Sequence, residues 1–327
     1  VGGMQIFRSE SFDTDGKVLP RAAEIASRIS IVYLTLTVVC GLSYLAVGMG
    51  FFDAVNHAMT TIATGGFSTH DESFGFFQGP AEYVAALFML LASLPFVRYV
   101  QLLAGSSEPL FRDSQVRAFL VSVVILVLVM VLFRISLQGA DAVRATRESL
   151  FNVTSIITGT GYASTDYQLW GSFPMAVFFF IGLIGGCAGS TCCSVKVFRY
   201  QILFAAVTNQ VKRIHSPNGV FKLKYDGHTL SEEIISSVMA FLTLFFVTLG
   251  LTAVLLSATG LDFITSVSGA ATAIANVGPG LGDQIGPAGY FGDLNSAAKW
   301  ILAAAMLIGR LELMVVFVLF TSRFWRA

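Results

Sequence analysis

Charged residues are scarce in this sequence. Only 12% of its 327 residues are Asp, Glu, Lys or Arg, whereas 55% are apolar, and the mean hydropathy is +0.74. This share of charge is about half that of an ordinary soluble domain, and a soluble protein cannot cover so much apolar surface with so few charges. The composition therefore excludes a cytosolic enzyme, a nucleic-acid-binding domain with a basic face and a disordered chain. It indicates a protein that crosses a membrane several times.

Cysteines and catalytic motifs are scarce as well. The 4 cysteines are too few for a disulfide scaffold. Cys187, Cys192 and Cys193 have no histidine or acidic residue near them in the sequence, so they do not resemble a zinc site. The histidines show no H-E-x-x-H spacing, and no G-x-S-x-G is present. We therefore expect neither enzymatic activity nor a bound cofactor.

Six apolar runs approach the length of about 20 residues that a helix needs to cross a membrane. They occupy residues 29–52, 83–97, 118–133, 173–195, 234–261 and 300–320. Three further stretches are too polar or too rich in glycine to face lipid, namely residues 53–68, 148–164 and 263–282. Backbone that is not helical persists at membrane depth only inside protein or beside water. We therefore expect these three stretches to be re-entrant, each a short helix followed by a loop.

The basic residues predict the orientation. If the N-terminus is cytoplasmic, 16 of the 20 Lys and Arg residues lie on or toward the cytoplasm and 4 lie outside. Cytoplasmic segments of membrane proteins are enriched in Lys and Arg. The re-entrant stretches are then expected to enter the membrane from the outside.

The three re-entrant stretches align with one another around a central glycine. Position −6 relative to that glycine is Thr or Ser, position +5 is always Asp, and each copy lies between two apolar runs. The repeated unit is a span, a short re-entrant helix, a glycine-centred loop and a second span. In chain order the central glycines are Gly66, Gly161 and Gly278, position −6 is Thr60, Ser155 and Thr272, position −2 is Thr64, Gly159 and Asn276, and position +5 is Asp71, Asp166 and Asp283.

Each loop is suited to hold a cation. A helix that ends in mid-membrane directs the negative end of its dipole inward, and glycine tolerates a positive φ. Carbonyl groups aimed at an axis can replace the hydration shell of a cation, and acids at position +5 would concentrate cations at the outer mouth. For a single copy, an ordinary turn between helices is the better interpretation. Three copies in register favour a pore.

Two further features are candidates for closing such a pore. Residues 185–194 (GGCAGSTCCS) are small throughout and interrupt the run 173–195, although small residues also permit close packing of helices. Arg310 lies within the last apolar run, where a charge costs on the order of 2.5–3.5 kcal/mol. Residues two apart on a helix do not face each other, so Glu312 is a poor partner for Arg310. We expect Arg310 to form an electrostatic barrier below the filter, with an ion pair to another acid as the alternative.

Four segments carry a combined signature: residues 64–71 (TGGFSTHD), 185–191 (GGCAGST), 276–282 (NVGPGLG) and 309–312 (GRLE). Together they resemble the Trk/Ktr/HKT superfamily of potassium transporters, most closely its bacterial Trk membrane subunit, over essentially the whole chain. The resemblance implies an all-α polytopic membrane protein, with membrane–pore–membrane repeats in a pseudo-four-fold set around one ion path. It implies potassium uptake through a carbonyl selectivity filter in the bacterial inner membrane, with K⁺ as the transported ion. Residues 1–8 resemble the stretch after the first repeat, so we expect that repeat to be missing here.

The resemblance also implies roles for single residues and for partners. It implies a homodimer and a cytosolic nucleotide-binding regulatory subunit, beside membrane lipid and without nucleic acid. The expected filter residues are Thr64, Gly65, Gly66, Gly159, Thr160, Gly161, Asn276, Val277 and Gly278, with K⁺ bound among them; the expected gate residues are Gly185, Gly186, Gly189, Ser190 and Arg310; and the outer-mouth acids remain Asp71, Asp166 and Asp283.

The sequence departs from the family at two places. After the Gly-Ser-Thr of the gating loop the family commonly continues with three glycines, whereas Cys192, Cys193 and Ser194 follow here. None of the three loops has the full potassium-channel filter sequence, since the middle one is TGTGY and the last has Pro279 after its glycine. The alternative function is a secondary transporter coupled to Na⁺ or H⁺, although such folds favour inverted repeats.

These patterns divide the chain into five parts. They are a cytoplasmic N-terminal segment (1–28), repeat A (29–105), repeat B with a broken second span (106–205), a basic cytoplasmic linker (206–233), and repeat C with the C-terminus (234–327). The basic residues of the linker satisfy the topology rule, contact lipid headgroups or, as the resemblance implies, dock the regulatory subunit.

Overall fold

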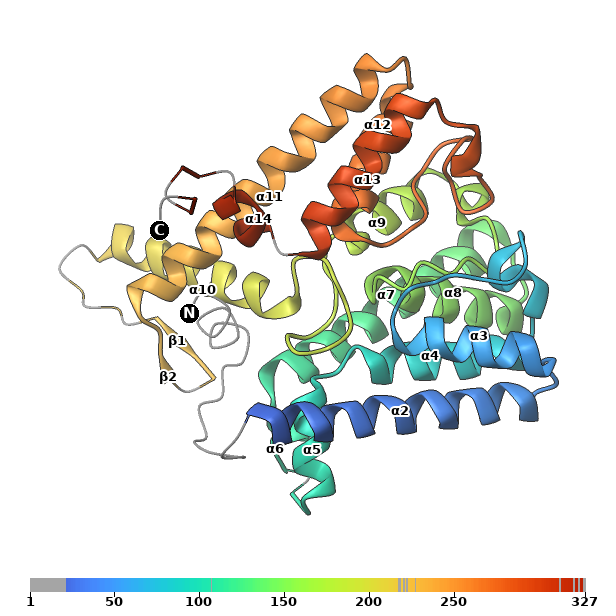
Figure 1. The fold of residues 1–327 in the computed structure, drawn as a ribbon, viewed down its shortest axis with the longest axis horizontal. Helices are drawn as coiled ribbons and strands as arrows, with labels where there is room; N and C mark the ends of the chain where they lie inside the picture. The colour runs from blue at the N-terminus through green and yellow to red at the C-terminus, as the bar shows by residue number, and fades with distance from the viewer. Residues whose placement is uncertain are drawn as a thin grey trace.

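The chain is mostly helical, as the sequence predicts (Figure 1). The structure, a computed structural model, describes residues 22–106, 108–216, 219, 221, 223–226, 228–311, 313–319, 321–322 and 324–325. Residues 1–21 of the predicted N-terminal segment and Glu312 lie outside the described residues. The α-helices are α2 (Ala22–Ala46), α3 (Phe51–Ile62), α4 (Pro80–Ala92), α5 (Phe96–Leu103), α6 (Glu108–Arg112), α7 (Ser114–Gln138), α8 (Ala142–Ile157), α9 (Ser172–Gly182), α10 (Val197–His215), α11 (Glu232–Ala258), α12 (Phe263–Ala275), α13 (Ser296–Arg310) and α14 (Leu313–Leu319).

Three helices, α2, α7 and α11, are each long and apolar enough to cross a membrane, and two bent helix pairs raise the possible spans to five among the described residues. Helix α12 lies inside the predicted re-entrant stretch 263–282, whereas α3 and α8 begin before the predicted stretches 53–68 and 148–164, at Phe51 and Ala142, and end within them. Aspartates begin several of these helices, because a carboxylate satisfies the first free N–H groups of a helix. Asp113, Asp141 and Asp262 cap α7, α8 and α12 in this way.

In repeat B, residues 183–196 separate the helices α9 and α10. We call residues 183–196 the intramembrane loop. The second span of repeat A differs from the prediction of a plain apolar run, because its two halves, α4 and α5, meet at an angle of 89°. Pro95 disfavours a helical conformation at Leu94 and itself has a φ of −63° and a ψ of 121°. The bend therefore has a local cause that uniform hydropathy conceals.

The bend in repeat A and the intramembrane loop of repeat B satisfy each other's backbone groups. The carbonyl of Ala92 accepts a hydrogen bond from the Thr191 hydroxyl at 3.1 Å, and the carbonyl of Ser93 accepts one from Cys187 N at 3.0 Å. The N–H of Phe96, the first residue of α5, donates to Gly189 O at 2.9 Å. Since lipid offers no partner to a free N–H or C=O, each interruption supplies the groups that the other leaves open.

Neighbouring repeats pack in the same way at both junctions. Helix α4 of repeat A packs on α8 of repeat B, and α9 of repeat B packs on α12 of repeat C. An ion pair to a buried carboxylate crosses the first junction, with Arg147 Nε 2.7 Å from Glu82 Oε2, and a buried ion pair within repeat B places Arg134 Nη1 2.7 Å from Glu148 Oε2. Two arginines that the topology rule leaves on the outer side therefore have carboxylate partners inside the protein.

Most of the segments predicted to be cytoplasmic lie on one side of the molecule. Helices α10 and α14 lie on the left of Figure 1 with the hairpin of β1 (Lys224–Tyr225) and β2 (His228–Thr229), and α5 and α6 lie at the bottom. Helix α10 continues to His215, well into the segment 206–233 that the sequence indicates as a linker.

We expect Arg147→Met to destabilise the protein by about 3 kcal/mol, because it leaves the buried Glu82 carboxylate without its ionic partner. The measurement is thermal unfolding in detergent. The matched control is Arg28→Met, which removes an exposed pair with Glu24 and should cost less than about 1 kcal/mol. Equal effects of the two variants would contradict a structural role for the buried pair.

Candidate functional site

The re-entrant helices α3, α8 and α12 each end at one of the three predicted filter segments, residues 64–66, 159–161 and 276–278. The three segments repeat one hydrogen-bond pattern. The carbonyl of the residue at position −6 accepts the N–H at position −1, with N–O distances of 2.8 Å for Gly65 to Thr60, 3.0 Å for Thr160 to Ser155 and 3.0 Å for Val277 to Thr272. The N–H of the central glycine also turns back, to the carbonyl of Thr60, the carbonyl of Ser155 and the hydroxyl of Thr272 respectively.

This pattern leaves filter carbonyls open. Within the described part of the chain, no N–H or O–H group donates to the carbonyl oxygens of Gly65, Thr160 and Val277. The helices that precede them add the negative ends of their dipoles, since α3, α8 and α12 end at residues 62, 157 and 275. Open carbonyl oxygens in a negative potential form a site for a cation without any charged side chain.

The three segments lie directly against one another. A Cβ atom added to Gly66, whose φ is +65°, would lie 1.9 Å from Thr160 O, and one added to Gly161, whose φ is +85°, would lie 1.8 Å from Val277 O. Only glycine permits these close approaches, and it adopts the positive φ angles without a steric cost. Segment A therefore contacts segment B, and segment B contacts segment C, through the residues that the sequence register places together.

The loops are held in place by hydroxyl groups that the sequence-based prediction of the site did not include. Thr60 Oγ1 donates to Phe67 O at 2.9 Å and Ser155 Oγ donates to Tyr162 O at 2.7 Å, each across its own loop, whereas the Thr272 hydroxyl accepts the N–H of Gly278. The repeated Thr or Ser at position −6 is the sequence signal that could have identified them. Tyr162, one residue after the central glycine of repeat B, reaches Thr60 in repeat A, a contact that no pattern within one repeat reveals.

The intramembrane loop lies below the first and third filter segments. The Thr64 hydroxyl is 3.0 Å from Thr191 O, and the Ser194 hydroxyl is 3.1 Å from Ala275 O at the end of α12. Gly185 and Gly189 have φ values of +77° and +74°, and the loop packs so closely that a Cβ on Gly186 would lie 2.7 Å from Cys192 Sγ.

Arg310 meets the same loop. Its guanidinium donates to the sulfur of Cys193 and makes no ion pair with a described residue. An open cavity of about 350 Å³ is lined by Ala63, by residues 190–194 of the loop and by Arg310. Gly309 allows this placement, because a Cβ there would lie 2.0 Å from Ile274 O. The predicted gate residues, Ser190 included, are thus brought together beneath the filter segments.

The three predicted outer-mouth acids differ from one another. Asp71 and Asp283 are exposed, whereas Asp166 is half-buried and its carboxylate accepts the N–H of Gln168 at 3.0 Å. Nearby, the Thr69 hydroxyl donates to Asp53 Oδ1 at 2.6 Å. This hydrogen bond, and more weakly the neighbouring His70, holds the pKa of the Asp53 carboxyl below its usual value.

Comparisons with known proteins agree with this geometry. The family model named TrkH, described as a cation transport protein, matches residues 1–326. The Trk system potassium uptake protein TrkI of Halomonas elongata is 44% identical over 328 residues, covering 100% of this chain and 66% of that protein. The Trk system potassium uptake protein TrkH of Escherichia coli K12 is 35% identical over 331 residues, covering 100% of this chain and 68% of that protein.

A solved structure is similar over nearly the whole chain. The crystal structure of the potassium transporter TrkH from Vibrio parahaemolyticus superimposes with a TM-score of 0.89 at 33% sequence identity, covering 99% of this chain and 70% of that one. The chain thus spans about two thirds of the length of these relatives.

We expect Gly161→Ala to abolish cation passage, because its Cβ would lie 1.8 Å from Val277 O and displace the third segment. The matched comparison is Gly159→Ala, which has a similar positive φ but no atom nearer than Asn276 O at 3.9 Å. It should retain part of the activity, reduced only by backbone strain. Rubidium uptake measures both, and equal loss in the two variants would contradict the role assigned to the close approach.

Proposed function

This chain belongs to the TrkH family of cation transport proteins, and on that premise we propose that it takes part in potassium uptake as the pore-forming membrane component. It is a multi-pass membrane protein, which we place in the bacterial inner membrane. The observation that carries the proposal is the contact between three filter segments whose N–H groups all turn back toward their helices. The names of the relatives, potassium uptake proteins and a potassium transporter, support the choice of ion.

We propose that K⁺ binds at carbonyl oxygens of the nine expected filter residues. Gly66 and Gly161 let the segments approach one another, and the neighbouring carbonyls take the place of water around the ion. The exposed Asp71 and Asp283 would attract cations to the outer mouth. The hydrogen bond to Gln168 N suits Asp166 better to holding its loop than to attracting ions.

We propose that the intramembrane loop and Arg310 form the gate. The cavity that extends from Ala63 to Arg310 is the support for this proposal, since an ion leaving the filter inward would enter it. A fixed guanidinium there repels cations, and the loop narrows the remaining path. Movement of the loop would displace both the loop and Arg310 from the path of the ion, because the Arg310 guanidinium is hydrogen-bonded to Cys193 within the loop.

The partners remain proposals. The name Trk system, carried by the relatives, implies that further components act with the membrane subunit, and we propose a cytosolic nucleotide-binding regulatory subunit. Exposed basic residues at the end of α10 and in the hairpin, among them Lys212, Arg213 and Lys224, offer a docking surface at the predicted cytoplasmic end. We also propose a homodimer, and lipid contact for the exposed apolar faces of α2, α7 and α11.

Rubidium uptake tests the proposed function most simply. The protein, in the longest form that its gene encodes, is expressed in cells that lack their own potassium uptake, beside the 327-residue chain and with Na⁺ as competitor. If Na⁺ inhibits the rubidium uptake only weakly, the result supports potassium transport. Uptake that depends on a Na⁺ or H⁺ gradient would favour the coupled transporter, and no uptake with the regulatory subunit present would contradict the proposal.

The hydrogen bonds between loop and filter predict the behaviour of a gate variant. Ser194→Ala removes the hydroxyl that lies 2.9 Å from Gly182 O and 3.1 Å from Ala275 O. Because one hydrogen bond contributes about 1 kcal/mol, the closed state should lose about fivefold in population relative to the open state. We expect a higher basal rate of rubidium uptake. The control is Ser43→Ala, because the hydroxyl of Ser43 donates only within α2; it should leave the uptake rate unchanged. An unaltered uptake rate in Ser194→Ala would contradict a role for these hydrogen bonds in holding the gate closed.

A further inference from the structure

Tyr162 joins the filter segments of repeats A and B. It follows the central glycine of repeat B, is fully buried, and directs its hydroxyl away from its own repeat toward α3. The hydroxyl oxygen is 2.5 Å from Thr60 Oγ1, 3.3 Å from Thr61 Oγ1 and 3.3 Å from His57 O. The ring is held separately by aromatic neighbours, with Phe74 at a centroid distance of 5.1 Å. Loss of the hydroxyl alone would therefore leave the packing of the ring in place.

The contact continues to a carbonyl of the first filter loop. Thr60 Oγ1 lies 2.9 Å from Phe67 O, the carbonyl directly after Gly66, and 3.0 Å from Asn56 O within its own helix. A threonine hydroxyl has a single hydrogen to donate, so these two carbonyls compete for it. When Tyr162 donates to Thr60, one of the lone pairs of that oxygen is occupied and its orientation is restricted. The tyrosine hydroxyl thereby holds the Thr60 side chain, and through it the carbonyl of Phe67 in the first filter loop, in a position that repeat B helps to set.

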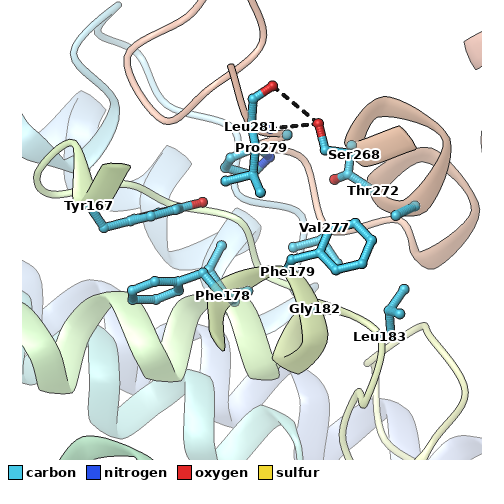
Figure 2. A pocket seen from close by; sticks show the side chains of 13 residues that line it. Tyr167, Phe178, Phe179, Gly182, Leu183, Ser268, Thr272, Val277, Pro279 and Leu281 are labelled. Atoms are coloured by element: carbon cyan, nitrogen blue, oxygen red, sulfur yellow. Dashed lines mark hydrogen bonds between the residues drawn. The ribbon is translucent and has the colours of Figure 1, made fainter. Parts of the chain in front are cut away.

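At the junction between repeats B and C the hydrogen bonds lie beyond filter segment C: Gly282 N donates to Gln168 Oε1 at 2.6 Å, and Gln168 Nε2 donates to Gly282 O at 3.4 Å. The residue after the central glycine of repeat C is Pro279, which carries no hydroxyl. Pro279 instead lines a small cavity of about 30 Å³ with Tyr167, Phe178, Phe179 and Leu281 (Figure 2), room for a water-sized molecule. Among the described residues, Tyr162 thus links the loops of segments A and B through a side-chain hydroxyl, whereas the loop of segment C has no tyrosine at the equivalent position and is linked to repeat B through Gln168 and Ser194.

We propose that Tyr162 is a specificity-determining positioning residue, whose hydroxyl, acting through Thr60, fixes the carbonyl spacing between filter segments A and B and thereby the preference for K⁺ over Na⁺. The inference rests on the proposed potassium function and deepens it. The carbonyl spacing matters because the smaller Na⁺ needs shorter carbonyl contacts, and oxygen atoms that are held in place resist that contraction. Tyr162 itself does not touch the ion.

The test is the strength of Na⁺ inhibition of rubidium uptake in Tyr162→Phe. We expect uptake to persist and the Na⁺ concentration that halves it to fall about fivefold, the effect that the loss of one intramolecular hydrogen bond gives. The matched control is Tyr167→Phe. Tyr167 is also buried, at the B–C junction, and its hydroxyl makes no hydrogen bond to a described residue. This control should retain the inhibition of the unmodified protein.

Variants at Thr60 test the connection itself. Thr60→Val should lower the discrimination as Tyr162→Phe does, whereas Thr60→Ser keeps a hydroxyl and should preserve it. The double variant Tyr162→Phe with Thr60→Val should be no worse than either single one, because both remove the same connection. Unchanged Na⁺ inhibition in Tyr162→Phe, or an equal change in Tyr167→Phe, would overturn the inference.

A second readout does not need transport. Purified protein is heated in Rb⁺ or Na⁺, and the concentration of each ion that gives half-maximal stabilisation is measured. The ratio of the Na⁺ concentration to the Rb⁺ concentration is then compared between variants. If Tyr162→Phe stops uptake altogether, a reduced ratio still supports the inference and an unchanged ratio contradicts it. Failure of the proposed function is distinguishable, because the unmodified protein would then show neither uptake nor stabilisation by Rb⁺.

Discussion

The structure depends on one constraint: inside a membrane, backbone N–H and C=O groups must find partners within the protein or face water. Three filter loops, the bend between α4 and α5, and the intramembrane loop all leave the helical conformation at this depth. The filter loops return their N–H groups to the residue at position −6, and the bend and the intramembrane loop exchange hydrogen bonds through Ser93, Gly189 and Thr191. Most of these departures from helix therefore have their free backbone groups satisfied by hydrogen bonds within the protein.

The groups that this exchange leaves open are carbonyl oxygens, and they are concentrated where the three re-entrant helices end. A row of unpartnered carbonyls would be costly in lipid, but a cation that sheds its water is the complementary partner for it. The same elements connect the filter to the residues below it. Thr64 belongs to a filter segment and contacts the intramembrane loop, while Gly309 brings Arg310 beneath α12. The proposed filter and the proposed gate are thus parts of one hydrogen-bonded assembly.

Much of this architecture could be predicted from the sequence. Apolar runs indicated the long apolar helices, and a register of glycine, hydroxyl and acid predicted three equivalent loops, which share one hydrogen-bond pattern in the structure. The role of these loops as a filter stays a prediction. The bend at Pro95 was missed, because hydropathy is uniform across it and only the proline marks it. The contact from Tyr162 to Thr60 could not be found, since it depends on which repeat lies beside which. The Asp at position +5 recurs in all three copies, yet Asp166 holds its own loop, so residue identity in register did not fix an identical environment.

The central claim is that carbonyl oxygens of the filter segments bind the transported ion. Anomalous scattering from crystals of the protein grown in Rb⁺ tests this most directly, because the ion is located without reference to transport rates. The account predicts density between the carbonyls of Gly65, Thr160 and Val277, where three described segments converge. Rubidium found only at outer carboxylates such as Asp71 and Asp283, with nothing between the filter segments, would contradict it.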